Sequence, residues 1–101
     1  MYWNITDKNR LIVALGIADK QGLYKDFLAE LLTKEELEAC VTRLKAMCML
    51  YDGATYIQVR DLLGLSPSTI SRLAKVVKNN KSGFLKIMRK FEDMGNPEYF
   101  D

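Results

Sequence analysis

The chain has 101 residues, of which 49% are hydrophobic and 28% are charged, with a formal net charge of +2. A chain of this length is expected to form one domain, residues 1–101, with a modest core that a second subunit would enlarge. It contains no histidine, no glycine-rich phosphate loop and no carboxylate pair in an apolar stretch, so we expect no enzyme, no metal site and no cofactor.

The longest apolar run, residues 11–18, follows Lys8 and Arg10. Its eight residues are few for a signal peptide and far fewer than the roughly 20 that cross a bilayer. Cys40 and Cys48 lie eight positions apart, a spacing that fits no zinc or redox motif. We expect both to be buried and reduced, in a cytoplasmic protein with no membrane segment.

The first 53 residues are predicted to form three helices and to build the core. Asp7 is expected to cap a helix over 8–20, and a second helix follows over 23–32. Thr33 and Glu36 form a capping box that opens the longest helix, 34–52. The apolar positions of the first helix cover more than one side, which indicates dimerisation through this segment. The expected inward positions of the longest helix are Leu37, Cys40, Val41, Leu44, Met47, Cys48 and Tyr51.

Residues 55–78 have the pattern of two short helices joined by a tight turn. Thr55 and Gln58 form a second capping box, and Gly64 can take the positive φ that stops the first of these helices. Ser66 and Pro67 can then start the second helix as its N-cap and first residue. The expected inward positions are Val59, Leu63, Leu65, Ile70, Leu73 and Val77. This pattern is typical of a helix-turn-helix, although similar helix pairs occur in many all-α proteins.

Positive charge is concentrated in the second half of the chain. Residues 62–91 carry seven Lys or Arg and no Asp or Glu, whereas residues 1–61 carry eight basic and nine acidic residues. Such a block is an electrostatic footprint for phosphate groups. The residues expected on the outer side of the second helix of the motif are Ser68, Thr69, Ser71, Arg72, Lys75 and Lys78. Small hydroxyls followed by cations suit a helix that meets base edges first and phosphates afterwards.

A final helix over 83–94 completes the prediction of an all-α fold with about six helices. Its inward residues are expected to be Phe84, Ile87, Met88 and Phe91, and its outward residues Lys86, Arg89 and Lys90.

Residues 31–73 resemble the tryptophan-operon-repressor superfamily, and in particular its YerC/YecD-like branch. The resemblance rests on Leu32-Thr33, Thr42-Arg43-Leu44, Gly53, Thr55-Tyr56, Gly64 and the run from Ser68 to Arg72. It implies an intertwined homodimer of the Trp repressor type, with two recognition helices in successive major grooves. It also implies a bacterial transcriptional regulator.

The resemblance assigns roles to individual positions. It implies base contacts from Ser66, Pro67, Ser68, Thr69 and Ser71, and backbone or flanking contacts from Tyr56, Ile57, Arg60 and Lys78. Arg60 stands where many helix-turn-helix proteins have a small buried residue, so we expect its stem along the core and its guanidinium at a phosphate.

Arg43 and Arg72 match the two arginines that hold the ligand in the tryptophan-binding branch, and a guanidinium pair suits a carboxylate. The plainer interpretation of Arg43 is a surface residue paired with Glu36. Leu73 stands where that branch keeps a small residue, and Val76 lies one turn later. The two side chains would fill the space of an indole, so a small-molecule corepressor fits the arginines but tryptophan is disfavoured.

The sequence therefore predicts a sequence-specific regulator, a repressor, that binds double-stranded DNA through a helix-turn-helix. Lys75, Lys78, Lys81 and Arg60 would neutralise phosphates, and Arg72 would contact bases or phosphates or help to fix the helix. The alternative is a helical protein-interaction module whose basic face binds an acidic partner.

Overall fold

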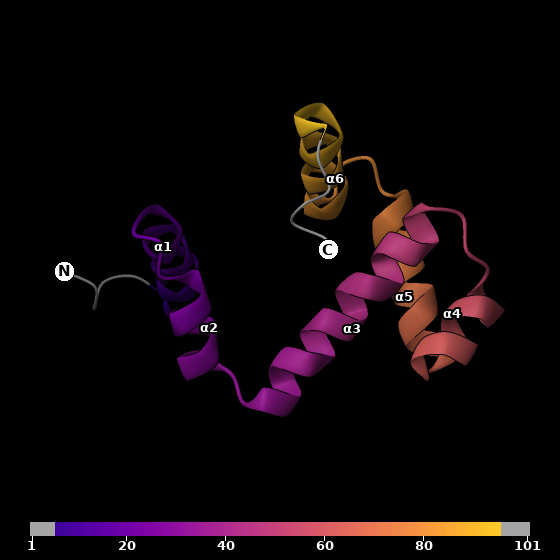
Figure 1. The fold of residues 1–101 in the computed structure, drawn as a ribbon, viewed down its shortest axis with the longest axis horizontal. Coiled ribbons are helices and arrows are strands. Elements are labelled where there is room, and N and C mark those ends of the chain that lie inside the picture. Colours follow the sequence, from indigo (N-terminus) through magenta and orange to yellow (C-terminus); the bar gives the residue numbers. More distant parts are fainter. Residues whose placement is uncertain (1–5, 96–101) are drawn as a thin grey trace. The chain divides into compact units, whose positions relative to one another are not determined.

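The structure, a computed structural model, describes residues 6–95, and these residues form six α-helices and no strand (Figure 1). The helices are α1 (Asp7–Lys20), α2 (Tyr24–Leu31), α3 (Lys34–Tyr51), α4 (Tyr56–Leu63), α5 (Pro67–Lys78) and α6 (Gly83–Met94). The prediction of an all-α fold is confirmed. Backbone contacts divide the chain into two units, residues 1–40 and 41–101, which are taken in turn.

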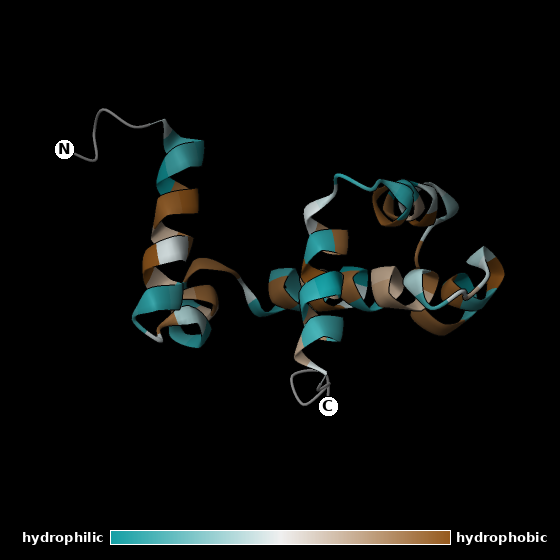
Figure 2. Ribbon diagram, turned by 90° about the horizontal axis from the view of Figure 1, so that it is seen from above, coloured by the Kyte–Doolittle hydropathy of each residue, from teal (hydrophilic) through white to brown (hydrophobic). Residues whose placement is uncertain are grey.

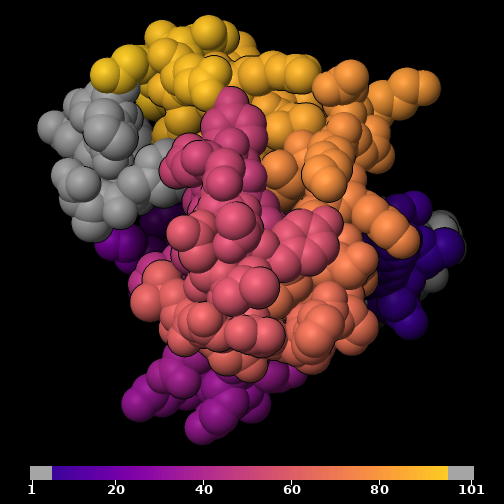
Figure 3. Space-filling model, turned by 90° about the vertical axis from the view of Figure 1, so that its right-hand side faces the viewer, coloured from indigo at the N-terminus to yellow at the C-terminus, as the bar shows by residue number. Residues whose placement is uncertain are grey.

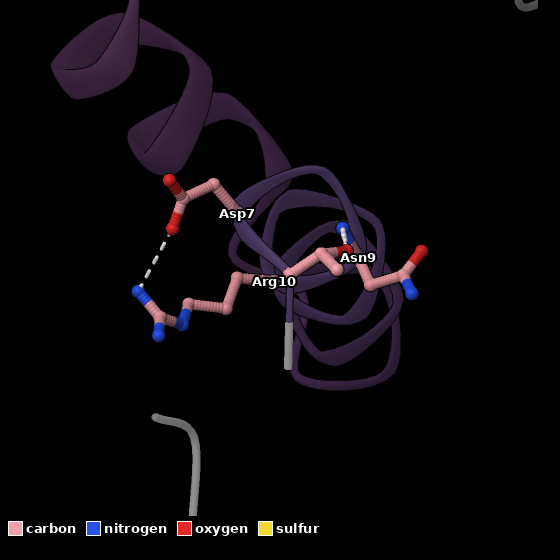
Figure 4. A network of polar contacts seen from close by, with 4 residues as sticks. Asp7, Asn9 and Arg10 are labelled. Carbon is pink, nitrogen blue, oxygen red and sulfur yellow. Dashed lines mark hydrogen bonds and ion pairs between the residues drawn. The ribbon is translucent and has the colours of Figure 1, made fainter. Parts of the chain in front are cut away.

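The first unit contains α1 and α2, which pack against each other. Thr6 caps α1, since its side chain accepts a hydrogen bond from the Asn9 amide at 3.3 Å. The expected cap, Asp7, is wrong: it lies in the first turn and forms an ion pair with Arg10 at 3.1 Å (Figure 4). Threonine and aspartate can both cap a helix, and here Thr6 takes that position. Asp7 is then the first helical residue, where the helix dipole favours a carboxylate.

Much of the apolar surface of this first unit is exposed. Ala18 is the one buried residue between 6 and 40. Figure 2 shows apolar residues, in brown, along α1 beside the N-terminus. The side chains that are 43–57% exposed include Leu11, Ile12, Val13 and Ile17. A helix pair alone cannot bury apolar positions that occupy more than one side of α1.

Helix α3 begins with the predicted capping box. The Glu36 carboxylate accepts the Thr33 amide at 2.9 Å, and the Thr33 hydroxyl accepts the Glu36 amide at 3.1 Å. The expected buried stripe along α3 is wrong in part, because Cys40, Val41 and Leu44 are exposed and Cys48 is half-buried. The fully buried residue of α3 is instead Ala46.

The second unit has its core between the end of α3, α4 and α5, and Figure 1 shows the last two side by side. Ala46, Val59, Ile70 and Leu73 form a buried cluster, each at most 2% exposed. The six predicted inward positions of the motif are all buried or half-buried. Packing of this kind fixes α5 relative to its neighbours, because interiors are close-packed.

The turn of the motif also follows the prediction. Gly64 ends α4 with φ 69° and ψ 19°, and its amide donates to the Arg60 carbonyl at 2.8 Å. The Thr55–Gln58 capping box is formed, and Ser66 caps α5 with Pro67 as its first residue.

Helix α6 packs against α5 and the end of α3. Ser82 caps it, and the Phe84 ring meets the Tyr51 ring edge-on at a centroid distance of 6.1 Å. The Tyr51 hydroxyl donates to the Glu92 carboxylate. The expectation that Ile87 points inward is wrong: Ile87 is 57% exposed, and Leu85 is buried instead. The helix is turned so that its buried side runs through Phe84, Leu85, Met88 and Phe91.

None of the six helices has the length and hydropathy needed to span a membrane. Residues 6–95 contain no cluster of histidine, cysteine, aspartate and glutamate that could hold a metal ion. The acidic residues at 98 and 101 lie outside the described residues.

Candidate nucleic-acid interface

The N-terminal end of α5 carries a cluster of hydroxyl groups. Ser66 accepts the Thr69 amide at 3.2 Å and donates to the Thr69 hydroxyl at 2.9 Å. The Ser68 hydroxyl lies 3.2 Å from that of Ser66. The cap therefore fixes the orientation of these side chains, while Ser68 itself stays exposed. A fixed, exposed hydroxyl can donate to or accept from a base edge.

The exposed polar residues of α5 lie on one side of the helix. At 100° per residue, Ser68, Ser71, Arg72, Lys75 and Lys78 fall within an arc of about 120°. No described carboxylate pairs with the three cations of this arc, since both ion pairs among residues 6–95 lie elsewhere. Ile70, Leu73 and Ala74 occupy the buried side. The arc is thus cationic, and the core behind it fixes its position.

Two predicted outward residues of α5 are less exposed than expected. Thr69 and Ser71 are half-buried rather than fully outside. Thr69 turns toward the edge of the buried side and is held by the cap, whereas Ser71 stays within the polar arc. The Thr69 hydroxyl accepts from Ser66 and keeps its own proton to donate, so the half-burial of Thr69 is what restricts a base contact.

The start of α4 is linked to the end of α5. The Lys78 ammonium lies 5.9 Å from the centroid of the Tyr56 ring. Ile57, next to Tyr56, is 60% exposed. In Figure 3, α4 in salmon and α5 in orange share one face. The structure therefore brings Tyr56 and Lys78 together, two predicted backbone or flanking contacts that the turn separates in sequence.

Arg60 does not lie along the core as expected. Its side chain is 52% exposed, and its guanidinium pairs with Asp61 at 2.9 Å. The neighbouring residue Val59 points into the core and is fully buried. Successive helix residues point about 100° apart, so Arg60 is turned away from the core. A phosphate contact from Arg60 would compete with Asp61.

The two arginines expected to hold a ligand, Arg43 and Arg72, are both exposed. The plainer expectation that Arg43 pairs with Glu36 is wrong, because the Glu36 carboxylate accepts a hydrogen bond from the Thr33 amide instead. That hydrogen bond from the Thr33 amide lowers the pKa of Glu36. Leu73, the residue expected to fill the space of an indole, is 2% exposed and belongs to the core cluster.

Comparison with known proteins gives one result. A family model described as "Trp repressor protein" matches residues 7–92. The match includes all of α1 to α5 and most of α6, and therefore the whole helix-turn-helix. No curated protein and no solved structure matches the chain.

Proposed function

This chain belongs to the Trp repressor protein family, a family of helix-turn-helix DNA-binding regulators, and from that premise we propose how it acts. It is a sequence-specific repressor of the YerC/YecD-like branch that binds double-stranded DNA in the bacterial cytoplasm. The observation that carries this proposal is the polar arc of α5, with three cations and no acidic residue, on a buried core.

Each part of the arc has a separate task in this proposal. The base edges in the major groove are contacted by Ser68 and Ser71, with Ser66, Pro67 and Thr69 beside them. These edges differ among all four base pairs, so contacts to them can select a sequence. Arg72 lies between the hydroxyls and the lysines, and can reach a guanine or a phosphate. Lys75 and Lys78 neutralise phosphates and release counterions, which supplies sequence-independent affinity. Tyr56 and Ile57 flank this contact. Arg60 contacts a phosphate when its ion pair with Asp61 is broken.

The protein acts as a homodimer in this proposal, and residues 1–53 supply the dimerisation surface. The support is exposed apolar surface, which includes Ile12, Ile17, Val41 and Leu44, each at least 49% exposed. Ile12 and Ile17 belong to the first unit, and Val41 and Leu44 to the second. Exposed apolar groups on either unit usually mark a protein–protein interface. Residues 55–78 would then face the DNA, and residues 83–94 complete the single domain. Sedimentation equilibrium tests the dimer, and a monomer at micromolar concentration would contradict it.

Any small-molecule corepressor would be held by Arg43 and Arg72. Tryptophan is a poor candidate, because Leu73 fills the space its ring would take and is itself part of the core. Titration calorimetry with tryptophan should give no heat of binding. A saturable heat that Arg72→Ala removes would contradict this expectation.

DNA selection tests the proposed function. The protein is mixed with genomic fragments, bound fragments are sequenced, and their affinity is measured by fluorescence anisotropy. Ser68→Ala should relax the sequence preference by about 1 kcal/mol, the net contribution of one hydrogen bond to a base edge. The control is Asn80→Ala, an exposed neutral residue after α5 and outside the polar arc, which should leave the sequence preference unchanged.

Two results would overturn the proposal. One is that the wild-type protein enriches no fragment above background. The other is that an acidic protein, insensitive to nuclease, co-purifies with the chain while no DNA binds. That second result would favour the alternative of a protein-interaction module.

A further inference from the structure

A cavity lies at the end of α5 that is opposite its hydroxyl cluster. It has a volume of about 380 Å³ and is formed by the last turn of α3, the start of α4 and the last two turns of α5. Its apolar walls are Leu50, Ala54, Ala74 and Val77, together with the Tyr56 ring. All of these residues belong to the second unit.

Lys78 is the one charged side chain among the described residues that line this cavity. Within residues 6–95 its ammonium makes no ion pair with a carboxylate, and it lies against the Tyr56 ring. Arg43 and Arg72 do not line the cavity, so it is separate from the expected arginine pair.

Ligand sites in proteins combine mostly apolar walls with a few polar groups that fix orientation. Here the walls offer apolar contact over most of the volume, and the single cation offers one charge-assisted hydrogen bond. The complementary ligand has a compact apolar body and one carboxylate. A neutral ligand would offer the ammonium no opposite charge, and a dianion would meet only one cation.

We propose that this cavity binds a small monocarboxylate with an apolar body, and that the bound carboxylate takes the Lys78 ammonium away from DNA. The second half of the proposal rests on the proposed DNA-binding function. One phosphate contact contributes about 0.9 to the log–log salt slope, so its removal corresponds to about eightfold weaker binding per subunit at 0.1 M salt. The ligand therefore acts as an inducer that releases the protein from DNA.

Phenylacetate is the probe for the binding half, with phenylacetamide as a neutral ligand of the same shape. Amide chemical shifts of Gly53, Ala54 and Ala74 are followed by NMR as each compound is added to the full chain. Phenylacetate should shift them saturably, with a midpoint of about 1 mM or lower. Phenylacetamide should bind at least about tenfold more weakly, because its neutral carbonyl replaces the anionic carboxylate as the acceptor for the Lys78 ammonium.

Three variants separate charge from shape. Lys78→Met keeps the stem and should weaken phenylacetate binding at least about tenfold. Lys86→Met removes an exposed cation of α6 away from the cavity and should leave phenylacetate binding unchanged. Ala54→Leu should fill the cavity and abolish binding, with thermal unfolding measured to confirm that the fold is kept. Equal affinity for the two compounds, or full affinity in Lys78→Met, would overturn the proposal.

The DNA half has its own readout. Saturating phenylacetate should weaken binding of a selected duplex about eightfold per subunit, and phenylacetamide at the same concentration should not. Saturable phenylacetate binding without any DNA binding would refute the proposed function but not the cavity. DNA binding with no phenylacetate-induced shifts would refute the cavity but not the proposed function.

Discussion

Replacement of Gly64 by alanine tests how the helix-turn-helix turn is made. Gly64 has φ 69°, and an added Cβ would find no atom within 4 Å. The substitution therefore causes no clash, and its cost is that of left-handed backbone for a residue with a side chain. That cost is about 1 kcal/mol. With a typical slope of about 2 kcal/mol per molar urea, the unfolding midpoint should fall by about 0.5 M.

Gly83 provides a matched control, because an added Cβ is equally unhindered there but the backbone is not left-handed. Gly83→Ala should leave stability unchanged or raise it by up to about 1 kcal/mol, since alanine restricts the unfolded chain. Both variants are unfolded in urea at one protein concentration, because the stability of an oligomer depends on concentration. If Gly64→Ala is neutral, or if both variants shift in the same direction, the backbone argument is refuted.

Three further predictions concern stability and its pH dependence. Ile70→Val in the core should cost about 1 kcal/mol of unfolding free energy in urea, whereas Ile57→Val on the surface should change it by less than about 0.5. The pKa of Glu36 lies below its ordinary value of 4.5, because the carboxylate accepts a backbone amide, so stability should fall as pH drops below that value. Thermal unfolding of Glu36→Gln should show a smaller decrease. The pKa of Tyr51 lies above 10.0, chiefly through its hydrogen bond to Glu92, so stability should decline as pH rises past 10, and less in Tyr51→Phe.

Local signals in the sequence predicted the helix boundaries well. The caps at Thr33, Thr55 and Ser66 each depend on a hydrogen bond to a residue three positions away, so sequence alone can identify them. The error at Asp7 has the same origin, because Thr6 and Asp7 are adjacent and both can cap. The cap at Ser82 was not predicted, although a serine before an apolar run is the usual signal for one.

Contacts between distant residues could not be predicted in the same way. The burial of Leu85 instead of Ile87 depends on how α6 is turned against Tyr51, which helical spacing alone does not determine. The approach of Lys78 to Tyr56 joins residues on either side of the turn. Arg60 has Asp61 as a partner, a local contact that the sequence did permit. Val41 and Leu44 are exposed because α4, α5 and α6, the other helices of the second unit, do not cover their side of α3.

The salt dependence of DNA binding is the sharpest test of the claim that the polar arc of α5 contacts phosphates. The affinity of the wild-type protein and of Lys75→Ala for one selected duplex is measured between about 50 and 200 mM salt. We predict that the variant binds more weakly and that its log–log slope is smaller by about 0.9 for each phosphate that it no longer neutralises. An unchanged affinity with an unchanged slope would contradict the claim.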